Sequence, residues 1–275
     1  MKNRKLLANT ATYVVLGVAA ILTIFPLFWV GLTSLKNNRD AMANASRAFD
    51  FEPTMMNYVR VITSHNFRSA LLTSVIITVS ATIVTVIIAT MGAYAFARLR
   101  FRGRTLLATV MVVVQIIPGI VLVIPLFRMV SALRMYDQLL PIIIIMTGLS
   151  IPFATWIILA FFKSMPVEIE EAALVDGASR IRLFRYVLIP MVAPGAATAA
   201  IFTAIDVWNA YLTPLVLGQT RAQTLTVYVA QFITFQDIEW GPLCASAVLI
   251  LSPIVLFVLS LQRSLVRGLT AGSVR

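Results

Sequence analysis

The sequence predicts an all-α integral membrane protein with six transmembrane helices. Hydrophobic residues make up 60% of the 275 residues, and charged residues make up only 12%. A soluble domain carries about 25% charged residues, because its surface must be solvated. A chain with so few charged residues cannot form a surface that is solvated by water, but it can expose apolar side chains to lipid.

The apolar residues are gathered into six runs that are long enough to cross a membrane. A transmembrane helix needs roughly 20 mostly apolar residues to cross about 30 Å of hydrocarbon. The strands of a membrane barrel would instead alternate apolar and polar residues over about 10 positions. In chain order we expect helices over residues 11–35, 70–97, 105–127, 139–162, 191–217 and 243–261.

The first run follows Lys2, Arg4 and Lys5, so a signal peptide has to be considered. The run is too long for the apolar core of a typical signal peptide, and no clear A-x-A cleavage site follows it. We therefore expect an uncleaved first helix.

Basic residues are distributed unequally between the two sides of the predicted membrane domain. With an even number of helices both termini lie on one side. That side holds four acids and fourteen of the 22 basic residues, namely Lys2, Arg4, Lys5, Arg98, Arg100, Arg102, Arg104, Lys163, Arg180, Arg182, Arg185, Arg263, Arg267 and Arg275. The positive-inside rule then places both termini in the cytoplasm. The net charge of +11 is a topology signal, and we expect no nucleic-acid partner.

We expect three parts along the chain. Residues 1–69 form the first helix and the longest outer loop, residues 70–262 form the membrane core, and residues 263–275 form a cytoplasmic tail. Cys244 is the single cysteine, so no disulfide can form within the chain. His65 is the single histidine and has no cysteine or acid at ligand spacing, so we expect no metal site.

The long inner loop at residues 163–190 is the most informative segment. Pro166 suits a helix start, and Gly177 can end that helix before Ser179 caps the next one. Acids in the first turn favour the helix dipole, and they are Glu168, Glu170 and Glu171. Ala173 and Gly177 share one helical face, where small residues let another backbone approach. The loop predicts a helix–turn–helix at the inner membrane surface, and an ordinary amphipathic connector is the alternative.

This loop resembles the EAA signature of permease subunits in bacterial binding-protein-dependent ABC importers. The signature reads Glu-Ala-Ala, three residues, Gly, nine residues, then Ile-x-Leu-Pro. Glu171, Ala172, Ala173 and Gly177 match it identically, and residues 187–190 match it with conservative aliphatic changes.

Other stretches resemble the carbohydrate branch of that family, specifically the maltose-type subunit that pairs with a longer permease. They are FEPTMMNY, AYAFARLRFRG, IIPGIVLVIPLF, WNAYLTPLVL and LQRSLVRGLTAGSVR, which together span nearly the whole chain. Asn209-Ala210 departs from the family pattern, in which an acid often follows Trp-Asn, and Asp206 stands three residues before it. The departure bears on the identity of the substrate.

The resemblance implies the type I ABC importer permease fold and a non-enzymatic role in the bacterial cytoplasmic (inner) membrane. Residues 167–177 would form a coupling helix that docks on an ATPase, with contacts from Glu171, Ala172, Ala173, Asp176 and Gly177. The implied partners are a second permease subunit, an ATPase dimer, an extracytoplasmic substrate-binding protein and membrane lipid. ATP and Mg would bind to the ATPase, since this chain has no phosphate loop and no cofactor of its own. The implied solute is a sugar, a glycoside or a polyol.

The resemblance also bears on the C-terminal tail and on the third outer loop. Residues 268–275 resemble the segment that reaches the ATPase interface in the maltose-type subunit, and a frayed terminus is the alternative. Residues 219–239 would face the binding protein and reach toward its ligand cleft.

A candidate substrate pathway comes from polar residues inside the apolar runs. Asp206 is the only acid within such a run, and an ionisable group in a membrane helix usually faces a cavity or a partner. Trp208, Asn209 and Tyr211 lie near it in the sequence, and Gln115 in the third run is a further candidate. Alternatively, Asp206 bonds a neighbouring helix, and Trp208 with Tyr211 belongs to an interfacial aromatic belt.

The sequence argues against two other classes of function and leaves a third alternative open. A secondary transporter would need inverted repeats and buried charge pairs, and the sequence has no such repeat. An intramembrane enzyme would need a positioned nucleophile, base or metal cluster, and the sequence has no H-E-x-x-H motif, no paired acids in the apolar runs and no histidine in them. A permease of the peptide or amino-acid branch shares the EAA loop and stays open as an alternative within the family.

Overall fold

The computed structural model describes residues 2–43, 47–235 and 237–271, with the side chains of residues 2–9, 11 and 257–271 left aside. Within these residues the elements are helices, and a single isolated bridge pairs Ile233 with Ile238. The chain divides into two compact units. Unit 1 comprises the chain up to Arg68 with Val229–Pro253, and unit 2 comprises Ser69–Tyr228 with the chain from Ile254 onward.

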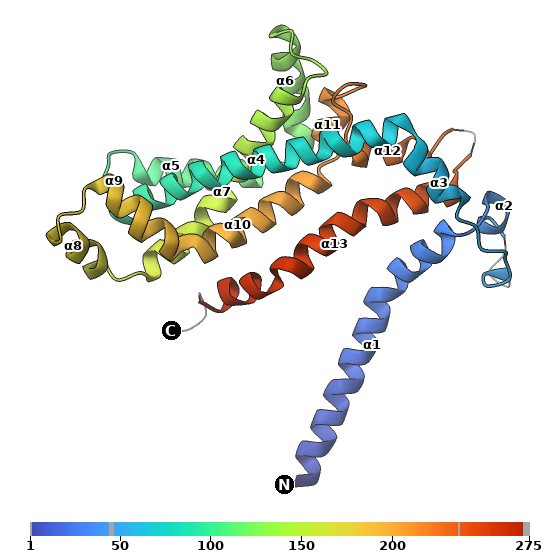
Figure 1. Ribbon diagram of the computed structural model, residues 1–275, viewed down its shortest axis with the longest axis horizontal. Helices are drawn as coiled ribbons and strands as arrows, with labels where there is room; N and C mark the ends of the chain where they lie inside the picture. The colour runs from blue at the N-terminus through green and yellow to red at the C-terminus, as the bar shows by residue number, and fades with distance from the viewer. Residues whose placement is uncertain (1, 44–46, 236, 272–275) are drawn as a thin grey trace. The chain divides into compact units, whose positions relative to one another are not determined.

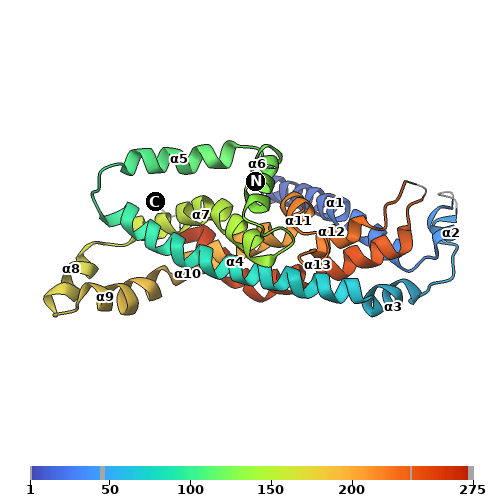
Figure 2. The same ribbon diagram turned by 90° about the horizontal axis from the view of Figure 1, so that it is seen from above.

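Unit 2 is built around three long helices that run side by side in both Figure 1 and Figure 2. They are α4 (His65–Arg98), α7 (Leu139–Ser164) and α10 (Ile189–Asn209). Each is long and apolar enough to cross a membrane, as is α1 (Lys2–Ser34) over residues 12–34. Four of the six predicted membrane helices therefore have a counterpart that is long and apolar enough to cross a membrane.

Small residues let these helices approach one another closely. Ala89 and Ala93 of α4 are fully buried, and a Cβ at Gly92 would lie 3.7 Å from the Thr155 side chain of α7. On α10, a Cβ at Gly195 would overlap the ring of Phe161. Packing of this kind drives helix association in lipid, where no hydrophobic force brings apolar helices together.

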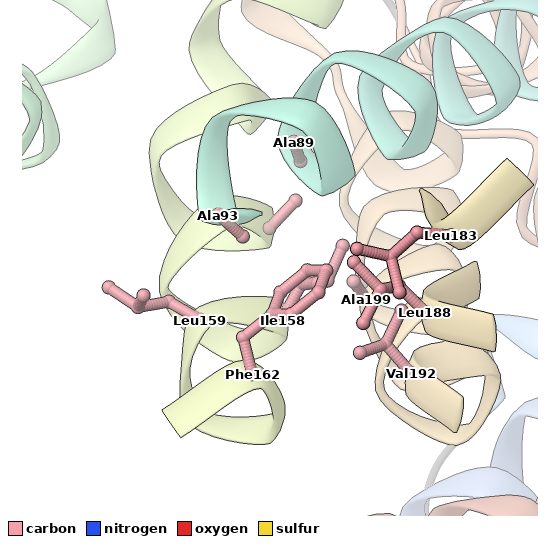
Figure 3. Packing of buried hydrophobic residues seen from close by; sticks show 10 residues of the cluster. Ala89, Ala93, Ile158, Leu159, Phe162, Leu183, Leu188, Val192 and Ala199 are labelled. Atoms are coloured by element: carbon pink, nitrogen blue, oxygen red, sulfur yellow. The ribbon is translucent and has the colours of Figure 1, made fainter. Parts of the chain in front are cut away.

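The core of unit 2 lies where α4, α7 and α10 meet the inner loop. In Figure 3 the ring of Phe162 on α7 lies toward Leu188 and Val192, and all three side chains are fully buried. The ring of Tyr94 on α4 packs at a tilt against Phe162 and edge to face against Phe184, with ring centres 5.7 Å and 5.4 Å apart. The core thus joins the membrane helices to the segment that precedes α10.

The third predicted helix is bent, contrary to the expectation of one continuous span. Residues 105–127 fall into α5 (Arg104–Ile116) and α6 (Gly119–Ala132), whose axes differ by 102°. Pro118 has no amide hydrogen and disfavours helical backbone in the residue before it, and Ile117 is accordingly extended with ψ 120°. The pair counts as a fifth span only if the two pieces are taken together.

The last two predicted helices also differ from expectation. The predicted helix at residues 191–217 is interrupted at Ala210, where ψ is 127°, and resumes as α11 (Leu212–Leu217). The predicted helix at residues 243–261 lies within α13 (Trp240–Ala271), of which residues 240–256 form a shorter apolar helix with described side chains. The count of six spans is not confirmed, and the cytoplasmic placement of the termini stays a prediction. Of the predicted tail, residues 272–275 lie outside the described part.

Unit 1 holds α1, α2 (Asn38–Ala41), α3 (Met56–Thr63) and the start of α13. The side chains of α1 from Tyr13 to Phe28 are largely exposed apolar groups, as expected of a helix surrounded by lipid. After α1, the buried Lys36 donates to the Ala48 carbonyl at 2.6 Å. Its ammonium also lies 4.7 Å from the centre of the Phe51 ring. This cation holds the first outer loop in place.

Candidate functional site

The inner loop folds as the predicted helix–turn–helix. The first helix is α8 (Glu168–Val175), and Gly177 follows it with φ +83°, a backbone conformation that favours glycine. Ser179 then accepts a hydrogen bond from the Arg182 amide and caps α9 (Arg180–Arg182). Figures 1 and 2 both place α8 and α9 together at one end of the α4–α7–α10 bundle.

Continuity between this loop and the membrane helix α10 is provided by a π-helical segment, η2 (Leu183–Leu188). Leu183 and Leu188 are buried in the core, and Ile189 begins α10 without a break. π-helical turns are rare and are frequent at functional sites. This π-helical turn could not be predicted from the sequence, because the side-chain pattern of residues 183–188 resembles that of an ordinary α-helix.

One acid of α8 faces the bundle and is paired. Glu170 Oε1 lies 2.5 Å from Arg98 Nε, and the two side chains are 8% and 13% exposed. Arg98 Nη2 also donates to the Met165 carbonyl at 3.0 Å. The last residue of α4 therefore holds both the end of α7 and the start of α8. The sequence analysis missed this role of Glu170, which it treated as one of three acids near a helix start.

The opposite face of α8 is open. Glu171 and Ala172 are exposed, and so are Asp176 and Gly177 in the turn. No atom lies within 4 Å of the position that a Cβ on Gly177 would take. Ala173 differs from the other predicted coupling residues, because it packs partly against the core cluster of unit 2. Four of the five predicted positions thus present a surface that another protein can reach.

A cavity of about 470 Å³ lies in unit 2 between residues of α5, α7 and α10. Volumes of roughly 300–1,000 Å³ are usual for small-molecule sites. The cavity brings together three of the predicted pathway residues, Gln115, Asp206 and Asn209. Its other lining residues are Leu149, Ser150, Phe153, Phe202, Thr203 and Ile205.

Two predicted pathway residues do not line this cavity. Trp208 is 9% exposed and packs in the interior of unit 2, and Tyr211 lies beyond the end of α10. Asp206 and Asn209 are three residues apart and share a helical face, whereas Trp208 points to another side. Sequence proximity to Asp206 was therefore a poor guide to the cavity wall.

Six residues of the cavity wall were not predicted from the sequence, and four of them carry aromatic rings or hydroxyls. Phe153 and Phe202 meet edge to face with their ring centres 5.8 Å apart. Ser150 and Thr203 are 5% and 2% exposed, and their hydroxyl oxygens have no hydrogen-bond partner among the described residues. Serine, threonine and phenylalanine are common in membrane helices, so the sequence alone does not single them out.

A second structured feature ties two loops of unit 2 together. The carboxylate of Asp137 accepts hydrogen bonds from four consecutive backbone amides, those of Gln219, Thr220, Arg221 and Ala222, at 2.8–3.1 Å. Asp137 itself has φ 58° and donates its own amide to the Leu217 carbonyl. Burial acts to raise the pKa of Asp137, and the four amide bonds outweigh it, so the pKa lies below its usual value.

Unit 1 contains a separate cavity of about 600 Å³, lined mainly by polar residues of α2, of α3 and of the segments before α3 and α13. Arg60 and Glu239 form an ion pair of 2.7 Å at its wall, and Asn38 bonds Asp237 at 3.2 Å. His65, the single histidine, is exposed. Among the described residues no three of histidine, cysteine, aspartate or glutamate form a group that could hold a metal ion.

Comparison with known proteins places these features in a family. Residues 85–271 match the model of the binding-protein-dependent transport system inner membrane component, and the match includes the end of α4, all of α7 and α10, and the inner loop. A probable ABC transporter permease of Sinorhizobium fredii is 32% identical over 258 residues, covering 94% of this chain and 92% of its own length. The trehalose transport permease SugB of Mycobacterium tuberculosis is 35% identical, covering 98% and 99%. The trehalose/maltose permease MalG of Thermococcus litoralis is 31% identical, covering 93% of each chain.

Solved structures have the same fold. A chain of a bacterial ABC transporter involved in the import of the acidic polysaccharide alginate superimposes with a TM-score of 0.78 at 21% identity, covering 94% of this chain and 96% of that one. At this identity the match shows the fold alone. Together with the family model and the relatives, it assigns the protein: the chain belongs to the binding-protein-dependent transport system inner membrane components, the multi-pass permease subunits of ABC transporters, in which a separate subunit hydrolyses ATP.

Proposed function

We propose that the chain is one membrane subunit of an ATP-driven importer for a sugar, a glycoside or a polyol. The substrate class is supported by the relatives, whose names refer to trehalose and to trehalose/maltose transport. The stretches that resemble the carbohydrate branch lie along the whole chain, which agrees with that class. Specificity within the class rests on the cavity and on the binding protein that delivers the solute.

The observation that carries the proposal is the two-sided character of α8. Glu171, Ala172, Asp176 and Gly177 form an open face for an ATPase, while Glu170 binds the loop to Arg98 at the end of α4. A movement imposed on the open face is transmitted to α4 and α7 through that ion pair and through the shared core. ATP and Mg bind on the ATPase dimer, whose closure drives the bundle between inward- and outward-facing states.

The remaining partners follow from surfaces that the chain leaves uncovered. A second permease subunit completes the pathway, since Asp206 and Asn209 at the cavity are exposed in the single chain. A substrate-binding protein docks on the outer side, on the loop that begins at Gln219, whose first four amides are bonded by Asp137. Lipid covers the apolar side chains of α1.

Affinity purification from the native membrane in mild detergent, with mass spectrometry of the companions, tests the assembly. We expect a second six-to-eight-helix permease and an ATPase in stoichiometric amounts. Recovery of the chain alone, or as a homodimer without an ATPase, would contradict the importer and favour a secondary transporter. A sample of the Gly177→Asp variant serves as the matched control, because it should enter the membrane and lose the ATPase selectively.

A further inference from the structure

We infer that the cavity around Asp206 excludes negatively charged solutes and admits neutral or positively charged ones. The inference rests on the proposed importer function, which makes this cavity part of a substrate path. It goes further by naming the charge class of the solute and the residue that sets it.

The first argument is the charge of the cavity wall. Asp206 is the only ionisable side chain among the nine residues that line it, and no lysine, arginine or histidine stands there to balance it. The rest of the wall is apolar or carries amides and hydroxyls. Once the second permease subunit of the proposed importer covers this side of the cavity, a fixed charge there is poorly screened, so its field extends across the cavity and repels an anion that enters.

The second argument is the hydrogen-bonding capacity of the same wall. The hydroxyls of Ser150 and Thr203 are buried and lack partners among the described residues. Burying an unpaired hydroxyl is unfavourable, which makes a ligand that supplies the missing hydrogen bonds favourable by comparison. Gln115 and Asn209 add amide groups, and Asn209 uses its Nδ2 to bond the Ile205 carbonyl at 2.8 Å.

The third argument is the apolar part of the wall. Phe153 and Phe202 expose aromatic surface to the cavity beside the polar groups. A sugar ring has hydroxyls around its edge and C–H groups on its faces, so it can satisfy both kinds of surface at once. A carboxylate or sulfate on the ring would meet the Asp206 carboxylate without a compensating cation.

The experiment measures the charge preference of the cavity directly and needs no identified substrate. The assembled transporter is prepared with Cys244→Ser, which removes the only native thiol of this chain, and with Gln115→Cys across the cavity from Asp206. Two methanethiosulfonate reagents of similar size are compared, one trimethylammonium and one sulfonate. Mass spectrometry of this chain gives the modification rate at position 115 for each reagent.

With Asp206 present we expect the cationic reagent to react faster, after correction for the rates of the two reagents with a free thiol. Asp206→Asn should lower the ratio of cationic to anionic rates by about tenfold, because it removes the only charge that this chain contributes to the wall. Glu168→Gln is the control, since Glu168 lies on α8 outside the cavity and should leave the ratio unchanged. Asn209→Cys repeats the comparison from α10 in case Gln115→Cys does not assemble.

An unchanged ratio in Asp206→Asn would overturn the inference, and so would a lack of modification at both positions. The same samples separate this failure from failure of the importer function. Modification at position 115 should change when ATP and vanadate trap the ATPase, if the cavity alternates between two sides. If the ratio of cationic to anionic rates depends on Asp206 but modification at position 115 does not respond to nucleotide, the charge selectivity of the cavity stands and ATP-driven gating is contradicted.

Discussion

The guanidinium of Arg98 and the carboxylate of Glu170 meet at 2.5 Å although 72 residues separate them in the chain. The contact joins the last turn of α4 to the first turn of α8, and both side chains are largely buried. It gives the inner loop a fixed attachment to the bundle. A loop that transmits force needs such an attachment as much as it needs an open face.

Breaking this pair should destabilise the protein and weaken coupling. Glu170→Gln leaves Arg98 buried without its counter-charge, which costs up to about 3 kcal/mol in a buried pair. We expect a lower midpoint of thermal unfolding in detergent and reduced ATP-driven uptake. Glu168→Gln on the same helix is the matched control, because Glu168 is exposed. Equal effects of the two substitutions would show that the pair has no special role.

Gly177 and Gly103 offer a second comparison. Both have positive φ, +83° and +85°, and both have open space where a Cβ would stand. Replacement by alanine imposes a similar backbone cost at each, roughly 1 kcal/mol. We expect Gly177→Ala to reduce uptake several-fold and Gly103→Ala to leave it near normal, as measured per transporter in vesicles. A similar loss in both variants would mean that backbone strain alone is responsible.

Asp137 should stabilise the turn at residues 219–222 through its charge. Asp137→Asn keeps the side-chain shape and tolerates φ 58°, but loses the charge-assisted bonds to four amides, at a cost of about 2 kcal/mol. We expect faster hydrogen exchange at those amides in the variant. Asp50→Asn, at an exposed position, is the control.

The stabilisation of residues 219–222 by the Asp137 carboxylate has a predicted pH dependence. The folded pKa of Asp137 lies below its usual 3.8, so its contribution to stability is full above that value. As pH falls through the folded pKa, the carboxyl takes up a proton and the contribution is lost. The difference in exchange between wild type and Asp137→Asn should be constant from pH 5 to 8 and shrink below about pH 4. A difference that grew with acidity would contradict this assignment.

Gly195 should tolerate no side chain. Because a Cβ there would overlap the ring of Phe161, Gly195→Ala forces α7 and α10 apart at a cost of about 1–3 kcal/mol. We expect a lower thermal midpoint, with partial recovery in the double variant Gly195→Ala/Phe161→Ala. Gly148→Ala on α7 is the control, because no atom lies within 4 Å of its added Cβ.

The sequence predicted the inner loop well because its signals are local. Gly177 and Ser179 end one helix and cap the next through their own backbone and side-chain geometry. Which of three neighbouring acids faces the bundle depends instead on how α8 is rotated against α4, and the sequence holds no local signal for that. Glu170 was therefore missed as an anchor.

The membrane cavity was predicted in part for a related reason. Asp206 stands out because a charge in an apolar run is rare, whereas Ser150 and Thr203 do not stand out. Trp208 was chosen for its closeness in sequence, although two residues along a helix turn the side chain to another face. The bend after Ile116 was not predicted either, because the length of an apolar run does not show in which direction the helix axis continues.

The π-helical turn at residues 183–188 constrains how many residues this segment contains, as well as which residues they are. It holds one residue more than an α-helical path would, so deleting one residue there would restore an α-helix and rotate everything before it by about 100° around the axis of α10. Glu170 would then leave Arg98, and the open face of α8 would turn away with it. The segment sets the angular register between the loop and the bundle, so it should accept substitutions far more readily than insertions or deletions.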